Sequence, residues 1–150
     1  MIIREIELFE GFSEDMEGEL GEVFETVSFQ PGDVLFKQGD PAEDFYILHT
    51  GAVDVKIAGA RQTTHVADKP GEAVGWSSLA GRETYSASVE CTEPSTLIRI
   101  NKDMLDQVLR RHPSTGLIFY KRLARLVGER LIESYRELVK LREKDDRVIP

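Results

Sequence analysis

Short apolar runs separated by turn residues fill the chain between about residues 29 and 101. Runs rich in Val, Ile, Phe and Tyr alternate with Gly, Pro and Asp clusters such as Pro31-Gly32-Asp33 and Gly39-Asp40-Pro41. This alternation is typical of many short strands joined by tight turns. It predicts an antiparallel β-roll or jelly-roll barrel, a mainly β fold with some α-helix. The expected strands are Val34–Lys37, Phe45–His49, Ala52–Ile57, Thr63–Ala67, Tyr85–Cys91 and Thr96–Ile100.

Helical patterns flank this region on both sides. Ser13 precedes an acidic turn and can cap a short helix that runs to about Val23, because a helix N-terminus favours both a hydroxyl cap and negative charge. The apolar residues before it are expected to lie under the β-roll: Ile6, Leu8, Phe9 and Phe12. We therefore expect one domain, with N-terminal helices in 1–28, the β-roll in 29–101, C-terminal helices in 102–143 and a frayed tail in 144–150.

The C-terminal part of the chain predicts two helices. Met104, Leu105, Val108 and Leu109 have helical spacing, and Pro113 suits the first turn of a second helix that runs to about Glu143. Apolar or small residues repeat along this second helix at alternating steps of three and four: Leu117, Tyr120, Ala124, Val127, Leu131, Ser134, Leu138 and Leu141. Such a heptad seam predicts pairing with another helix, here a homodimer. The alternative is one helix that buries a broad face in its own domain.

Composition narrows the class of protein. The chain has 150 residues, 41% of them hydrophobic and 31% charged, as in a single globular domain. No apolar run reaches membrane-spanning length, and the N-terminus lacks a secretory pattern. The single cysteine, Cys91, fits a reducing compartment, so we expect a cytoplasmic protein without a membrane anchor. The net charge of -8 disfavours non-specific nucleic-acid binding.

Catalytic and metal chemistry find little support in the sequence. His49, His65 and His112 lie far apart and lack the dense His-x-His and Glu cluster of metal-binding cupin barrels. Cys91 has only Glu90 as a charged neighbour, which does not activate a thiol. We expect no enzyme activity, no metal and no cofactor, and a cupin-like metal enzyme remains the least favoured alternative.

One motif points to a binding site. Pro70–Leu79, with the sequence PGEAVGWSSL, is followed by Thr84–Val89, with the sequence TYSASV. Together with the segments Phe29–Asp40 and Phe45–Val53, these residues resemble the cyclic nucleotide-binding domain of catabolite-activator-type regulators, kinase regulatory subunits and gated channels. The resemblance implies a phosphate-binding cassette in which Gly75 permits close backbone approach. It also implies that Ser77, Ser78 and Leu79 form a short helix, and that Ser86 and Ala87 lie beside the phosphate.

Two residues depart from the family's cassette. The resemblance implies a carboxylate for the ribose 2′-hydroxyl where this chain has Trp76, and an arginine for the phosphate where it has Tyr85. Losing both partners should lower affinity by on the order of a thousandfold. Arg82 is the nearby cation: it either turns into the pocket or stays solvated beside Glu83. Trp76 and Tyr85 either fill the pocket or stack on a flat ligand that is not a cyclic nucleotide.

These observations leave two main hypotheses. The first is a non-catalytic sensor or regulatory module that binds a small-molecule effector at Gly75–Ser78 and Tyr85–Ala87, with Arg82 nearby, and acts on a partner protein. The second is a structural or protein-interaction dimer whose pocket is filled. The chain ends where the family's transcription regulators begin their helix-turn-helix, so we expect no direct DNA binding.

Overall fold

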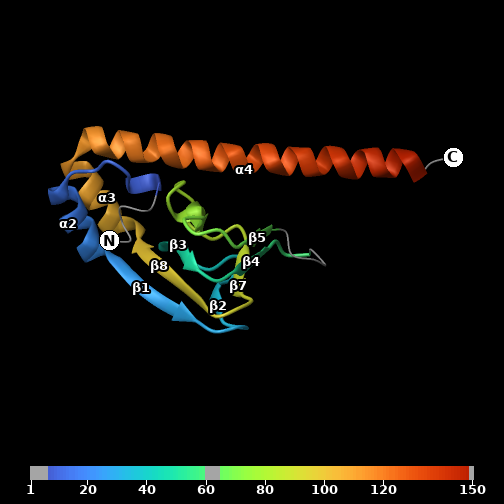
Figure 1. Cartoon of the computed structure of the whole chain (residues 1–150), viewed down its shortest axis with the longest axis horizontal. Coiled ribbons are helices and arrows are strands. Elements are labelled where there is room, and N and C mark those ends of the chain that lie inside the picture. The colour runs from blue at the N-terminus through green and yellow to red at the C-terminus, as the bar shows by residue number, and fades with distance from the viewer. Residues whose placement is uncertain (1–6, 60–64, 149–150) are drawn as a thin grey trace.

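The computed structural model describes residues 7–59 and 65–148. Two antiparallel sheets form the centre of the molecule, and helices cover one side (Figure 1). The first sheet contains β1 (Phe24–Phe29), β8 (Ser95–Asn101), β3 (Asp44–Thr50) and β6 (Ala73–Val74) in that order. The second contains β2 (Val34–Phe36), β7 (Ser88–Cys91), β4 (Val53–Lys56) and β5 (His65–Ala67). The predicted jelly-roll fold is confirmed, but its two four-stranded sheets are not closed into one hydrogen-bonded barrel.

Burial on both faces explains the continuous apolar run in strand β3. Phe45 and Ile47 pack in the cluster beneath the helices, whereas Tyr46 and Leu48 pack in the cluster between the sheets. Successive side chains of a strand point to opposite faces, so a strand covered on both faces needs apolar residues at every position. One apolar cluster therefore lies on each side of this sheet.

The helices follow their predicted starts closely. Ser13 caps α2 (Glu14–Val23) by accepting from the Met16 N–H, and Asn101 caps α3 (Lys102–Arg111) in the same way. The short η1 (Glu7–Phe9) precedes α2. Leu8, Phe9 and Phe12 are buried against β3 and β8 as expected, while Ile6 lies outside the described residues.

The long helix α4 (Pro113–Val148) packs on the domain only through its first half. Phe119 and Leu123 are buried, and Gly116 passes close to Leu109 of α3. From Leu131 to Asp145 every residue is exposed. In Figure 1 this second half of α4 projects beyond the rest of the chain as a single rod. Its apolar face is therefore uncovered in the isolated chain.

Several sequence-based boundaries were wrong. β1 begins at Phe24, inside the range 1–28 expected for N-terminal helices, and β6 was not predicted at all. The strand expected from Tyr85 begins at Ser88, because Tyr85 lies on an irregular segment instead. Thr63 and Thr64 of another expected strand fall outside the described residues, and β5 is seen from His65. The frayed tail expected from Lys144 is helical through Val148.

Candidate functional site

Gly75 shapes the cassette between β6 and η2 (Trp76–Ser78). Its φ of +80° is a left-handed conformation that side-chain-bearing residues rarely adopt. A Cβ there would lie 3.2 Å from the Asp44 carbonyl oxygen and 3.3 Å from the Phe36 ring. The Ser78 hydroxyl donates to the Gly75 carbonyl at 3.0 Å, which closes the turn. Only a glycine fits this corner without strain.

Tyr85 is built into the wall of the site. Its ring stacks on Phe36 with centroids 3.7 Å apart and an interplanar angle of 16°. Its hydroxyl donates to the Asp44 carbonyl at 2.5 Å and accepts from the Asp44 N–H at 3.2 Å. Burial raises the pKa of Tyr85 to about 12. The hydroxyl is fully engaged by backbone and has little capacity left for a ligand.

A cavity of about 390 Å³ opens beside η2 and Tyr85. We call it the cassette cavity. Ser77 and Ser86 both line it, and their hydroxyl oxygens are hydrogen-bonded at 3.0 Å. Most of its other lining residues are apolar, and strands of both sheets contribute to it. The lining is completed by Phe36, Val55, Ile57, His65, Ala73, Val74, Gly75, Trp76, Tyr85, Ala87, Val89, Val127, Arg130, Leu131 and Ser134.

Helix α4 supplies one wall of the cassette cavity through Val127, Arg130, Leu131 and Ser134. These residues lie on one face of the helix, because positions three or four apart along a helix are neighbours. Arg130 is half-buried, and burial lowers the pKa of its guanidinium while Glu72, Glu133 and Glu137 oppose that shift. The site is therefore a composite of the cassette and the long helix.

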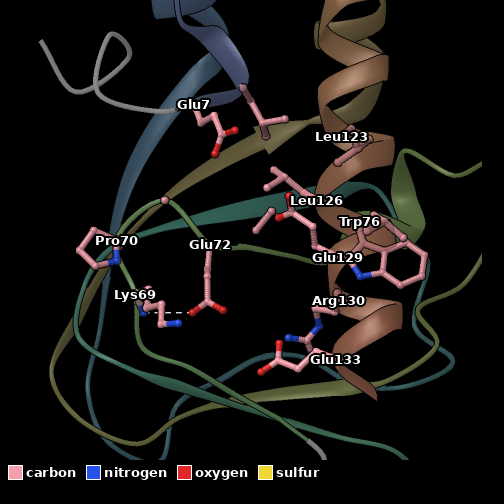
Figure 2. Close-up of a pocket in the computed structure, with 14 residues that line it drawn as sticks. Glu7, Lys69, Pro70, Glu72, Trp76, Leu123, Leu126, Glu129, Arg130 and Glu133 are labelled. Atoms are coloured by element: carbon pink, nitrogen blue, oxygen red, sulfur yellow. Dashed lines mark hydrogen bonds between the residues drawn. The ribbon is translucent and has the colours of Figure 1, made fainter. Parts of the chain in front are cut away.

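A second cavity of about 440 Å³ lies on the other side of the cassette, between η1, the loop before β6 and α4 (Figure 2). We call it the hinge cavity. Trp76, Arg130, Ala73 and Val127 line both cavities. In Figure 2 Glu72 reaches in from the loop, while Arg130 and Glu133 reach in from α4. Trp76 is half-buried and leaves both cavities open.

The structure brings most of the expected site residues together. Gly75, Trp76, Ser77, Tyr85, Ser86 and Ala87 all line the cassette cavity. Ser78 is buried in the turn instead, and Arg82 is exposed and lines neither cavity; its N–H donates to the Ser77 carbonyl at 3.2 Å.

Sequence reasoning missed Arg130, His65 and the apolar wall formed by Phe36, Val55 and Ile57. The placement of Arg130 three residues after Val127 carried a signal, since both lie on one helix face. The strand residues carried none, because their convergence depends on how the two sheets stack.

His65, His112 and Cys91 each contact a different part of the chain and do not form a common site. His65 Nε2 lies 3.3 Å from a Glu72 carboxylate oxygen, and His112 Nε2 lies 2.5 Å from Glu19. Cys91 is buried and its thiol donates to the Glu93 carbonyl. Within residues 7–59 and 65–148, no three His, Cys, Asp or Glu side chains lie close enough to hold a metal ion. In the same residues no helix has the length and apolar character needed to cross a membrane.

Comparison with known proteins agrees with this fold. The family model for the cyclic nucleotide-binding domain matches residues 26–112. The chain belongs to this family, and it is a cyclic nucleotide-binding domain of the regulatory kind.

Individual relatives are distant. The chain is 27% identical to the Pycsar effector protein BcPycTIR of Burkholderia cepacia, covering 89% of this chain and 42% of that one. It is 29% identical to the cAMP-dependent protein kinase regulatory subunit of Dictyostelium discoideum, covering 81% and 39%. The crystal structure of a cyclic nucleotide-binding domain from Methylobacillus flagellatus superposes with a TM-score of 0.78 at 27% identity, covering 93% and 79%. The chain thus spans less than half the length of these two curated relatives.

Proposed function

We propose that this domain is a non-catalytic ligand-sensing module whose cassette cavity binds a small molecule other than cAMP or cGMP held in the family's manner. One observation carries the proposal. The cassette has a glycine corner and an open cavity of about 390 Å³, and Trp76 and Tyr85 lie where the family resemblance implies the ribose carboxylate and the phosphate arginine. The cavity is present, whereas the carboxylate and the arginine that the resemblance implies for ribose and phosphate are absent from these two positions.

The chemistry of the two replacements supports this reading. An indole offers one N–H donor and no acceptor, so Trp76 cannot take the place of a carboxylate. The Tyr85 hydroxyl is neutral and already bonded to Asp44. A charge-assisted hydrogen bond is roughly twice as strong as a neutral one. Relatives such as the cAMP-dependent kinase regulatory subunit are named for a nucleotide that this pocket should hold weakly.

The alternative is a structural module whose pocket is filled. Tyr85 does fill part of the space, since it stacks on Phe36. Trp76 does not, since it borders two cavities that both remain open. The open volume favours a ligand-binding role over a purely structural one.

Titration of the full chain with cyclic AMP and cyclic GMP tests the proposal. Trp76 is the only tryptophan and borders the cavity, so its fluorescence reports on occupancy directly. We expect no saturable change in fluorescence, and no heat of binding by calorimetry, below about millimolar ligand. Saturable binding at micromolar cyclic nucleotide would overturn the proposal.

We further propose that α4 pairs with α4 of a second copy and that the dimer transmits the ligand signal to a protein partner. The seam residues in the second half of α4 are exposed, with Leu131 at 49% and Leu138 at 52%. Ile132, Tyr135 and Val139 widen this exposed apolar face. The seam's heptad spacing favours a helix of the same period as the occupant. A ligand in the cassette cavity contacts α4 and biases the dimer only if its affinity differs between two arrangements.

A further inference from the structure

The side chains that can carry a full charge in the lining of the cassette cavity are basic. Among its described lining residues none is Asp or Glu, and only Arg130 and His65 can carry positive charge. His65 already contacts Glu72 through its Nε2 atom. Among the described lining residues, this leaves the guanidinium of Arg130, which also borders the hinge cavity beside Glu72 and Glu133, as the group that can meet a negative charge on a ligand.

Arg130 lacks a close partner for its charge. Glu72, Glu133 and Glu137 act on it electrostatically. In the part of the chain that the structure describes, however, no carboxylate oxygen forms a salt bridge with its guanidinium. Burial lowers its pKa, the effect expected of a guanidinium that has lost water without gaining a close anion. It remains charged at neutral pH, because arginine does not deprotonate in proteins.

The cassette side of the cavity offers no such cation. Tyr85 is neutral and hydrogen-bonded to backbone, and Arg82 is exposed away from the cavity. Of the lining residues that the structure describes, the positive charge without a salt-bridge partner therefore comes from α4. The remaining wall is largely apolar, with the aromatic rings of Phe36, Tyr85 and Trp76 among its residues.

We propose that the cassette cavity selects a small organic anion with a flat apolar body, whose anionic group pairs with Arg130. This rests on the proposed function, and adds the ligand class and the residue that recognises it. The chemistry fits an aromatic carboxylate or sulfonate: the rings and aliphatic side chains take the flat body, and a planar guanidinium binds the two oxygens of such an anion.

The position of Arg130 on α4 links ligand binding to the arrangement of this helix. It lies directly before Leu131, where α4 changes from packed to exposed. A ligand bound to Arg130 holds the helix itself, and not only the cassette. Ligand binding and the arrangement of the exposed half of α4 are then coupled through Arg130, in addition to the wall formed by Val127, Leu131 and Ser134.

Two matched probes test the proposal on the full chain. The sulfonate 1-anilinonaphthalene-8-sulfonate and the neutral N-phenyl-1-naphthylamine share one ring system and differ in charge. Energy transfer from Trp76 identifies probe bound near the cavity. We expect Arg130→Gln to weaken sulfonate binding about 10-fold or more and to leave the neutral probe unchanged. Arg136→Gln, which removes the same charge from an exposed position of α4, should change neither.

A cavity variant separates the possible failures. Ala87 lines the cassette cavity, so Ala87→Leu should weaken both probes if they bind there. If Arg130→Gln and Arg136→Gln have equal effects, or Arg130→Gln has none while Ala87→Leu weakens both probes, this inference fails and the sensing role stands. If Ala87→Leu changes neither probe, the cavity does not bind them and this inference fails, whereas the sensing role is decided by the cyclic nucleotide titration. Unchanged melting temperatures establish that the variants are folded.

Discussion

Tyr85 stacks on Phe36 with ring centroids 3.7 Å apart, and the same tyrosine hydroxyl donates to the Asp44 carbonyl at 2.5 Å. This pair links the segment before β7 to β2 and β3. It places an aromatic wall where the family resemblance implies a phosphate-binding arginine. A tyrosine in place of the implied arginine therefore removes a positive charge from the pocket. It also adds the stack on Phe36 and the hydrogen bond to Asp44, which hold the pocket together.

Introducing the two side chains that the family resemblance implies should increase cyclic nucleotide affinity. The double variant Trp76→Glu/Tyr85→Arg supplies a ribose acceptor and a phosphate cation, each expected to contribute about 1.5–3 kcal/mol through charged hydrogen bonds. Calorimetry with cyclic AMP should show affinity at least about 100-fold above the wild type. The single variants serve as controls and should each give a smaller gain. A folded double variant with unchanged affinity would contradict our account of the pocket.

Removing the Tyr85 hydroxyl should destabilise the fold at neutral pH. Tyr85→Phe keeps the stack on Phe36 but leaves both the Asp44 carbonyl and N–H without this partner. We expect a loss of about 1–3 kcal/mol in the free energy of unfolding, measured by urea denaturation. Tyr135→Phe, at an exposed position of α4, is the matched control and should be neutral. Equal losses in both variants would rule out the backbone bridge as the cause.

The same hydroxyl should make stability depend on alkaline pH. The pKa of Tyr85 is raised to about 12 in the folded chain, against an unfolded value of about 10. Between these values the unfolded chain loses the proton first, so stability is complete below pH 10 and falls as pH rises towards 12. The expected loss is about 2–3 kcal/mol. Tyr85→Phe should lack this component, so the stability difference between wild type and variant should shrink above pH 10.

Gly51 should tolerate alanine far less well than Gly59. Both have positive φ, +99° and +86°, so both variants carry the left-handed strain of about 1–2 kcal/mol. At Gly51 a Cβ would also lie 2.1 Å from the Ser95 hydroxyl oxygen and 2.6 Å from the Pro94 carbonyl, whereas Gly59 has open space. We expect Gly51→Ala to cost a further 1–3 kcal/mol or so in urea unfolding. Similar losses for the two variants would disprove the steric argument.

Charge on the exposed half of α4 should break the proposed dimer. Leu138→Glu puts a carboxylate into the seam opposite its own copy, where like charges repel. Sedimentation should then show a monomer at concentrations where the wild type is a dimer. Lys140→Glu, on the other face of the same exposed stretch, should remain dimeric. A wild type that stays monomeric at all concentrations, or a Leu138→Glu variant that stays dimeric, would refute the pairing.

The sequence predicted the fold class because local signals and tertiary packing agree. Glycine and proline turns, apolar runs and the predicted cap Ser13 each specify structure within a few residues. Edge strands were less predictable. β1 carries the mixed sequence FETVSF and becomes a strand through its pairing with β8, and β6 has only two residues beside β3. Such strands are specified by their neighbours more than by their own propensities.

The sequence by itself determined the resemblance to the family's cassette and the departures from it at Trp76 and Tyr85, since Gly75, Trp76, Tyr85, Ser86 and Ala87 lie within one short segment. Only the tertiary structure decided what surrounds them. It directs the Tyr85 hydroxyl to Asp44, leaves Arg82 exposed, and brings Arg130 from α4 to a cavity formed mainly by strands and the cassette. The physical reason is distance along the chain: turn and helix preferences act over a few residues, whereas a pocket forms only when packed elements meet.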